Sequence, residues 1–259
     1  MLRGALTGYV DVAQVALYVF WGFFFGLVLY LIRENHREGY PLVSEVPGQV
    51  GRPITPGFPP VDIKFFRLYH GGIAQNPGLA DPRNELNARP AALFPGAPIE
   101  PLGDPFLDGI GPAAWAVRED LPDLTIDGAV KFRPMRDLEQ YSLDPRTPNP
   151  IGWPVVGADN IVAGHVIDVW IDEVENEVVY LELQLSDPLV GPVLVPQTFV
   201  RFRARTSTVS VRALLASQFE FIPRTRLPNV TTRLEEDRIL AYFGGGALFA
   251  TPARRGPLL

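Results

Sequence analysis

The stretch that decides the fold is VAQVALYVFWGFFFGLVLYLI, residues 12–32. It contains no charged residue and only one amide side chain. As an α-helix these 21 residues (12 through 32) would span about 31 Å, close to the roughly 30 Å hydrocarbon core of a bilayer. Because lipid offers the backbone no hydrogen-bond partners, the stretch is predicted to be a single transmembrane helix.

Basic residues beside this stretch predict its orientation. Arg33 and Arg37 follow it and Arg3 precedes it, so the positive-inside rule places the C-terminal side in the cytoplasm. A cleaved signal peptide is the alternative, but its apolar region has about 7–15 residues and ends at a small-residue cleavage site. The charged sequence RENHR at 33–37 therefore favours an uncleaved anchor.

The composition argues against several classes of function. The formal net charge is −6 and there is no basic cluster, so nucleic acid is not expected as a partner. The absence of cysteine excludes disulfides, thiolate metal sites and a cysteine nucleophile. With three histidines and no Ser-His-Asp or zinc spacing, neither a metal site nor an autonomous enzyme such as an anchored hydrolase is expected.

Residues 33–122 are rich in proline and glycine, most densely at 41–62. Proline at this density gives an extended, semi-stiff path. Residues 33–38 are predicted to continue the helix beyond the apolar stretch, until Gly39, Tyr40 and Pro41 stop it. A short strand is predicted at 63–69, and the rest of the segment is predicted to be loop-like. A loop of this length is rare in an isolated domain, so we expect it to lie on partner subunits that bury it.

Residues 123–259 contain several short strand patterns at close spacing, among them 160–171 and 178–185. This spacing predicts a small antiparallel barrel, so the fold class is a single N-terminal transmembrane helix followed by a mainly-β domain. In 178–185, valine and leucine alternate with polar residues and predict one face toward the core. Thr232 and Glu235 form a capping box that predicts a helix over 234–243, which glycines 244–246 either end or pack closely.

The sequence DEVENE at 172–177 places four carboxylates within six positions. Crowded carboxylates raise one another's pKa and can then hold and release protons near neutral pH. A solvated hairpin tip explains the same pattern, and no Asp/Asn-Gly spacing supports a cation site. The acidic residues at 235–237 are explained by capping and the helix dipole.

Six segments, in order behind the apolar stretch, resemble the H chain of the photosynthetic reaction centre of purple-type phototrophic bacteria. They are REGYPL at 37–42, GDP and DGIGPAAW within 103–115, REDLP at 118–122, NPIGWPV at 149–155, AGHVIDVWID at 163–172, and LEED at 234–237. The resemblance implies a PRC-barrel-type cytoplasmic domain with a C-terminal helix, residues 1–11 in the periplasm, and location in the bacterial inner (intracytoplasmic) membrane.

The resemblance also implies an accessory subunit that binds no cofactor or metal itself and is not an enzyme. The expected partners are the L and M subunits, which hold bacteriochlorophyll, bacteriopheophytin, quinones, non-haem iron and carotenoid. A cytochrome subunit, the core light-harvesting ring and membrane lipids are further candidate partners. The implied roles are to stabilise L and M, to shield the quinone region and to help deliver protons to the secondary quinone. A membrane-anchored PRC-barrel adaptor without a photochemical role is the alternative.

By position, Glu175 matches a buried family carboxylate near the secondary quinone, and Asp172 matches its acidic neighbour. Family members carry one aspartate and two histidines at the surface where protons enter, whereas this chain has Asp127 at one histidine position and Ala129 at the other. Asp123 and Asp127 are therefore the residues predicted to replace that cluster. The resemblance thus implies four proton-transfer residues: Glu175, Asp172, Asp127 and Asp123.

Overall fold

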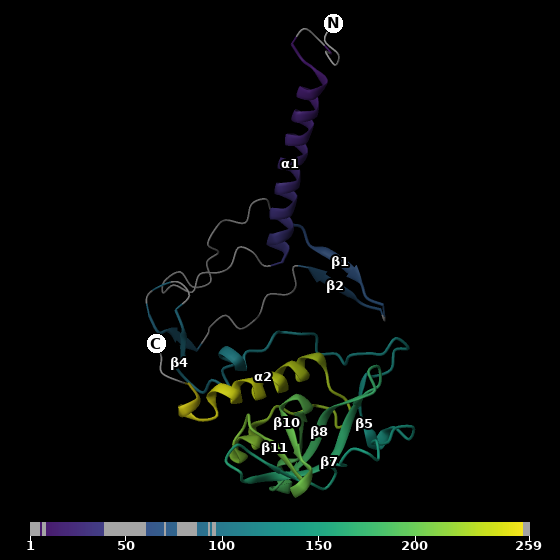
Figure 1. Ribbon diagram of the computed structural model, residues 1–259, viewed down its shortest axis with the longest axis vertical. Helices are drawn as coiled ribbons and strands as arrows, with labels where there is room; N and C mark the ends of the chain where they lie inside the picture. Colours follow the sequence, from purple (N-terminus) through teal and green to yellow (C-terminus); the bar gives the residue numbers. More distant parts are fainter. Residues whose placement is uncertain are drawn as a thin grey trace. The chain divides into compact units, whose positions relative to one another are not determined.

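The computed structural model describes residues 6, 9–38, 61–69, 71–76, 87–92, 94 and 97–255 (Figure 1). The chain divides into two compact units. The first comprises residues 1–82 and 90–98, and the second comprises residues 83–89 and 99–259. Nearly all of the predicted proline-dense segment 41–62 lies outside the described residues.

Helix α1, Val12–Arg37, is the dominant element of the first unit. Its N-terminus is fixed by a capping box, in which Asp11 accepts a hydrogen bond from the Gln14 backbone N–H at 2.8 Å and the Gln14 side chain accepts one from the Asp11 N–H at 3.2 Å. None of the side chains over residues 12–32 is buried. The predicted apolar helix is confirmed, and it is long and apolar enough to cross a membrane.

Helix α1 continues to Arg37, as predicted, and short strand pairs replace part of the loop predicted for 71–122. Strand β1, Lys64–Arg67, confirms the predicted strand and pairs with β2, Ile73–Asn76. Strands β3, Ala88–Pro90, and β4, Ile99–Pro101, form a second pair. The expectation of no strand after residue 70 is therefore wrong, because strands of three or four residues are too short for an alternating pattern to reveal.

The second unit is built on a seven-stranded sheet. Its strands are β5 (Phe132–Pro134), β6 (Pro154–Val156), β7 (Val162–Asp172), β8 (Glu177–Leu185), β9 (Pro192–Pro196), β10 (Val200–Arg203) and β11 (Thr208–Val211). The order is β10-β11-β6-β7-β8-β9, with β5 paired to β7. The pairings are antiparallel except for the parallel pair of β11 with β6. The predicted mainly-β domain is confirmed.

Strand β8 is buried on both faces in its central part. Leu181 and Leu183 are fully buried as the alternation predicts, but Tyr180 and Glu182 on the other face are also buried. Phe132 from β5 packs edge-on against Tyr180 with ring centroids 6.3 Å apart. The alternation gave no sign that the second face is also buried, because the β5 region that covers it is distant in sequence.

Helix α2, Arg233–Phe249, covers part of the sheet and extends beyond the predicted end at residue 243 (Figure 1). Its start is as predicted, with Thr232 accepting a hydrogen bond from the Glu235 N–H at 3.2 Å. A Cβ atom on Gly245 would lie 2.6 Å from the Ala113 Cβ. Of the two predicted roles for glycines 244–246, close packing is therefore the one observed.

Candidate functional site

Asp172 is the last residue of β7 and organises the acidic loop that follows. Its side chain is almost fully buried, and one carboxylate oxygen accepts hydrogen bonds from the N–H groups of Val174 (2.8 Å) and Glu175 (3.1 Å). The turn closes where the Asn176 N–H donates to the Asp172 carbonyl at 2.8 Å, with Asn176 at a φ of 56°. The loop between β7 and β8 is thus a tight, internally hydrogen-bonded turn.

Lys131 connects Asp172 to Asp123. Lys131 Nζ pairs with the second carboxylate oxygen of Asp172 at 3.0 Å, and the Lys131 backbone N–H donates to the Asp123 carbonyl at 2.9 Å. The Asp123 carboxylate pairs in turn with Arg233 of α2 at 2.9 Å. The structure therefore brings two of the four predicted residues, Asp172 and Asp123, into one charged cluster.

The other two predicted residues, Glu175 and Asp127, lie at turns and point into solvent. Both are exposed, and neither side chain has a hydrogen-bond or ion-pair partner among the residues that the structure describes. Asp127 precedes Gly128, whose φ of +84° shapes the turn between Leu124 and Val130. In the chain by itself, Glu175 is thus not a buried carboxylate, and Asp127 is not part of the charged cluster.

Glu236, in the first turn of α2, belongs to this cluster, although capping and the helix dipole were enough to explain it from the sequence. Its Oε1 atom is buried without a hydrogen-bond partner. Burial and, secondly, the negative charge of Asp123 raise the pKa of Glu236 to about 7, against the opposing charges of Lys131, Arg233 and Arg118. A carboxyl with this pKa can take up and release a proton near neutral pH.

The sequence offered only a weak signal for Glu236. It directly follows Glu235, which satisfies the capping box, so the second acid is not needed for the cap. Two of the charges that act on its pKa belong to residues more than 100 positions earlier in the chain: Asp123, which raises it, and Lys131, which lowers it. Burial and charge of this kind become visible only in the folded chain.

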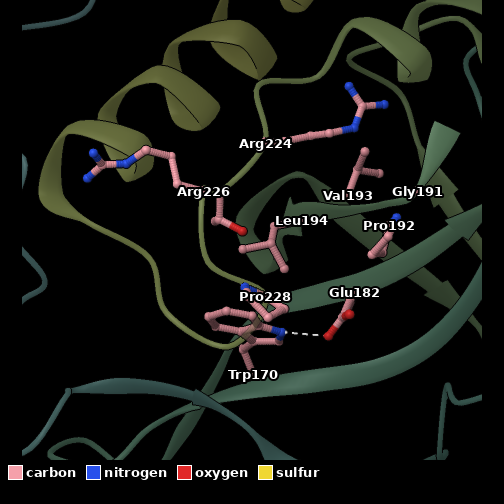
Figure 2. Close-up of a pocket in the computed structure, with 10 residues that line it drawn as sticks. Trp170, Glu182, Gly191, Pro192, Val193, Leu194, Arg224, Arg226 and Pro228 are labelled. Carbon is pink, nitrogen blue, oxygen red and sulfur yellow. Dashed lines mark hydrogen bonds between the residues drawn. The ribbon is translucent and has the colours of Figure 1, made fainter.

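A second buried ionic cluster lies elsewhere in the sheet. Arg136 donates hydrogen bonds to Asp168 and Glu182, and Trp170 Nε1 donates to Glu182 at 2.9 Å. Beside it is a cavity of about 240 Å³. The side chains of Arg224 and Arg226, which line this cavity, extend away from Glu182 (Figure 2). The carboxylates have cationic and indole partners, so this cluster acts as internal structural pairing rather than as an open reactive site.

Comparison with known families assigns both parts of the chain. Residues 4–137 match the family described as photosynthetic reaction centre, H-chain N-terminal region, and residues 146–215 match the PRC-barrel domain. The first match covers more than half of the chain. The chain belongs to the reaction centre H-chain family. The resemblance stated from the sequence is thereby confirmed.

Membership in the H-chain family fixes the coarse function. The chain is an accessory, non-pigmented subunit of a photosynthetic reaction centre, associated with the core subunits and with a membrane. The PRC-barrel match spans strands β6 to β11, whereas β5 and the cluster residues Asp123 and Lys131 fall within the H-chain match. The charged cluster therefore combines residues of both matched regions with Glu236, which lies outside both.

Proposed function

We propose that this H-chain family member stabilises the L and M subunits, shields the quinone region and delivers protons to the secondary quinone. Residues 33–122 form a surface segment that contacts L and M, residues 1–11 are periplasmic, and residues 123–259 form the cytoplasmic domain. The observation that carries the proton-delivery role is the cluster of Asp172, Lys131, Asp123 and Glu236. It joins the acidic loop to the surface turn that carries Asp127.

The four predicted residues and Glu236 have distinct parts in this proposal. Asp127 and Asp123 collect protons at the surface turn, and Glu236 stores one at a pKa of about 7. Asp172 holds the acidic loop through its two backbone hydrogen bonds. Glu175 then projects from that loop toward the partner subunits, which cover it and complete the pathway to the quinone.

Glu175→Gln tests the last step. The variant is expected to slow proton-coupled transfer of the second electron to the secondary quinone by about tenfold or more, since losing a positioned acid–base group commonly costs that much. Transfer of the first electron, which needs no proton, should keep its rate. The measurement is flash-induced absorbance kinetics of the purified complex over a range of pH.

Glu177→Gln is the matched control, because Glu177 is an exposed acid in the same loop region. It should leave both electron transfers unchanged. Equal rates and pH dependences for wild type and Glu175→Gln would remove Glu175 from the pathway.

The partnership itself is tested by gentle detergent purification on a tagged full-length chain. Stoichiometric bacteriochlorophyll in the near-infrared spectrum, with L and M co-purifying, is expected. A colourless preparation would favour a membrane-anchored PRC-barrel adaptor over a photochemical role.

A further inference from the structure

The β1–β2 hairpin has an apolar face that the other residues described by the structure leave uncovered. Phe65 lies opposite Gln75 and Arg67 opposite Ile73, and side chains alternate along a strand, so these four residues and Ile63 share one face. We call this set the outer face. Ile63, Phe65 and Ile73 are exposed by 52%, 66% and 66%. Since an isolated two-stranded hairpin is marginally stable in water, this face requires a cover.

The base of the hairpin is attached to the end of α1 by polar contacts. Arg37, only 5% exposed, donates hydrogen bonds to the backbone carbonyls of Asp62 and Asn76, the latter at 3.4 Å. Lys64 pairs with Glu34 at 2.7 Å. Because these contacts hold the ends of both strands, the position of the hairpin base follows from the position of α1.

The contacts lie at a defined depth relative to the bilayer. Glu34 and Arg37 are two and five residues beyond the apolar stretch that ends at Ile32. At 1.5 Å per residue this is about 3–8 Å past the hydrocarbon boundary. The headgroup layer on each side is roughly 5–8 Å thick, so the base of the hairpin is at headgroup level.

We propose that the outer face lies on the headgroup region of the bilayer that α1 crosses. Aromatic and aliphatic side chains are favoured at this depth when cationic residues accompany them. Arg67 supplies the cation, because it has no ion-pair partner within the described ranges and can therefore bind a lipid phosphate. The hairpin thus acts as a second membrane contact beside the transmembrane helix.

The absence of cysteine permits a direct measurement of depth. A spin label is placed at Phe65→Cys in the full chain, assembled in its complex, in nanodiscs of phosphatidylcholine and phosphatidylglycerol. Collisions of the label with dissolved oxygen, which concentrates in lipid, are compared with collisions with a water-soluble nickel chelate. Gln75→Cys places a label on the same face while retaining Phe65, and Phe221→Cys reports a position that is 58% exposed in the second unit.

The oxygen-to-nickel collision ratio is expected to be several-fold higher at positions 65 and 75 than at 221. A ratio at 65 and 75 equal to that at 221 would mean that the outer face is in water and would overturn the proposal. Shielding of both labels from both reagents would also overturn it, because that result identifies a protein partner rather than lipid as the cover.

Discussion

Glu236 is a residue at which burial and charge bring the titration of a single carboxyl group close to neutral pH. Its pKa is raised to about 7, from an ordinary value of 4.5, by burial and then by Asp123. The folded chain therefore holds a proton on Glu236 at pH values where the unfolded chain has lost it. The contribution of Glu236 to stability is consequently most favourable below about pH 4.5 and is lost as the pH rises through about 7.

Glu236→Gln should remove this pH-dependent loss. At pH 8 the variant is expected to be more stable than wild type by about 2 kcal/mol, a value reduced from the full shift because the group is not fully buried. Near pH 4.5 the two proteins should have nearly the same stability. Denaturant unfolding of the full chain in detergent at both pH values measures the difference in unfolding free energy between variant and wild type. If this difference were the same at pH 8 and at pH 4.5, the prediction would be contradicted.

Asp172 and Glu175 share one loop but have separable roles. Asp172→Asn keeps a side-chain acceptor for the two N–H groups yet loses the charge paired with Lys131. We expect a stability loss of about 1–3 kcal/mol, because Lys131 is left partly buried without its counter-charge. Glu175→Gln should change stability by less than about 0.5 kcal/mol, since an exposed side chain is altered. Thermal unfolding of both variants tests this contrast.

Among the elements, helix α2 depends on glycines for its packing as well as on its cap. Gly245→Ala would place a Cβ 2.6 Å from that of Ala113. The gain in helix propensity, about 1 kcal/mol, should be outweighed by an overpacking cost of about 1–3 kcal/mol.

The matched control is the double variant Gly245→Ala with Ala113→Gly, in which the clashing methyl group is removed. It should recover part of the lost stability, as measured by the denaturant midpoint. A single variant as stable as wild type would show that the contact is loose enough to relax.

For the whole molecule, the distribution of burial predicts where the chain opens. The second unit contains a large core in which Trp170, Phe219 and Phe243 are almost fully buried, whereas the β1–β2 hairpin has exposed apolar side chains. Backbone amides with few buried neighbours open most easily. In the full chain without partners, β7, β8 and α2 should therefore exchange hydrogen slowest, and β1 and β2 fastest among the strands.

Assembly should change this pattern selectively. Hydrogen exchange measured by mass spectrometry on the free chain and on the complex should show new protection at residues 61–76 and 87–101, with little change in β7. Equal exchange in both states would indicate that the N-terminal segment gains no cover from partners or membrane.

The sequence by itself determined the long apolar N-terminal helix, the mainly-β class, the start of α2 and the family resemblance. These depend on local signals: the length of an apolar run, alternation along a strand, the Thr232 capping box and short ordered motifs. Only the tertiary structure decided that Tyr180 and Glu182 are buried, that α2 continues through glycines 244–246, and that Glu236 joins Asp123 and Lys131. The physical reason is that desolvation, steric fit and coupling between charges arise between segments distant in sequence, which no local pattern records.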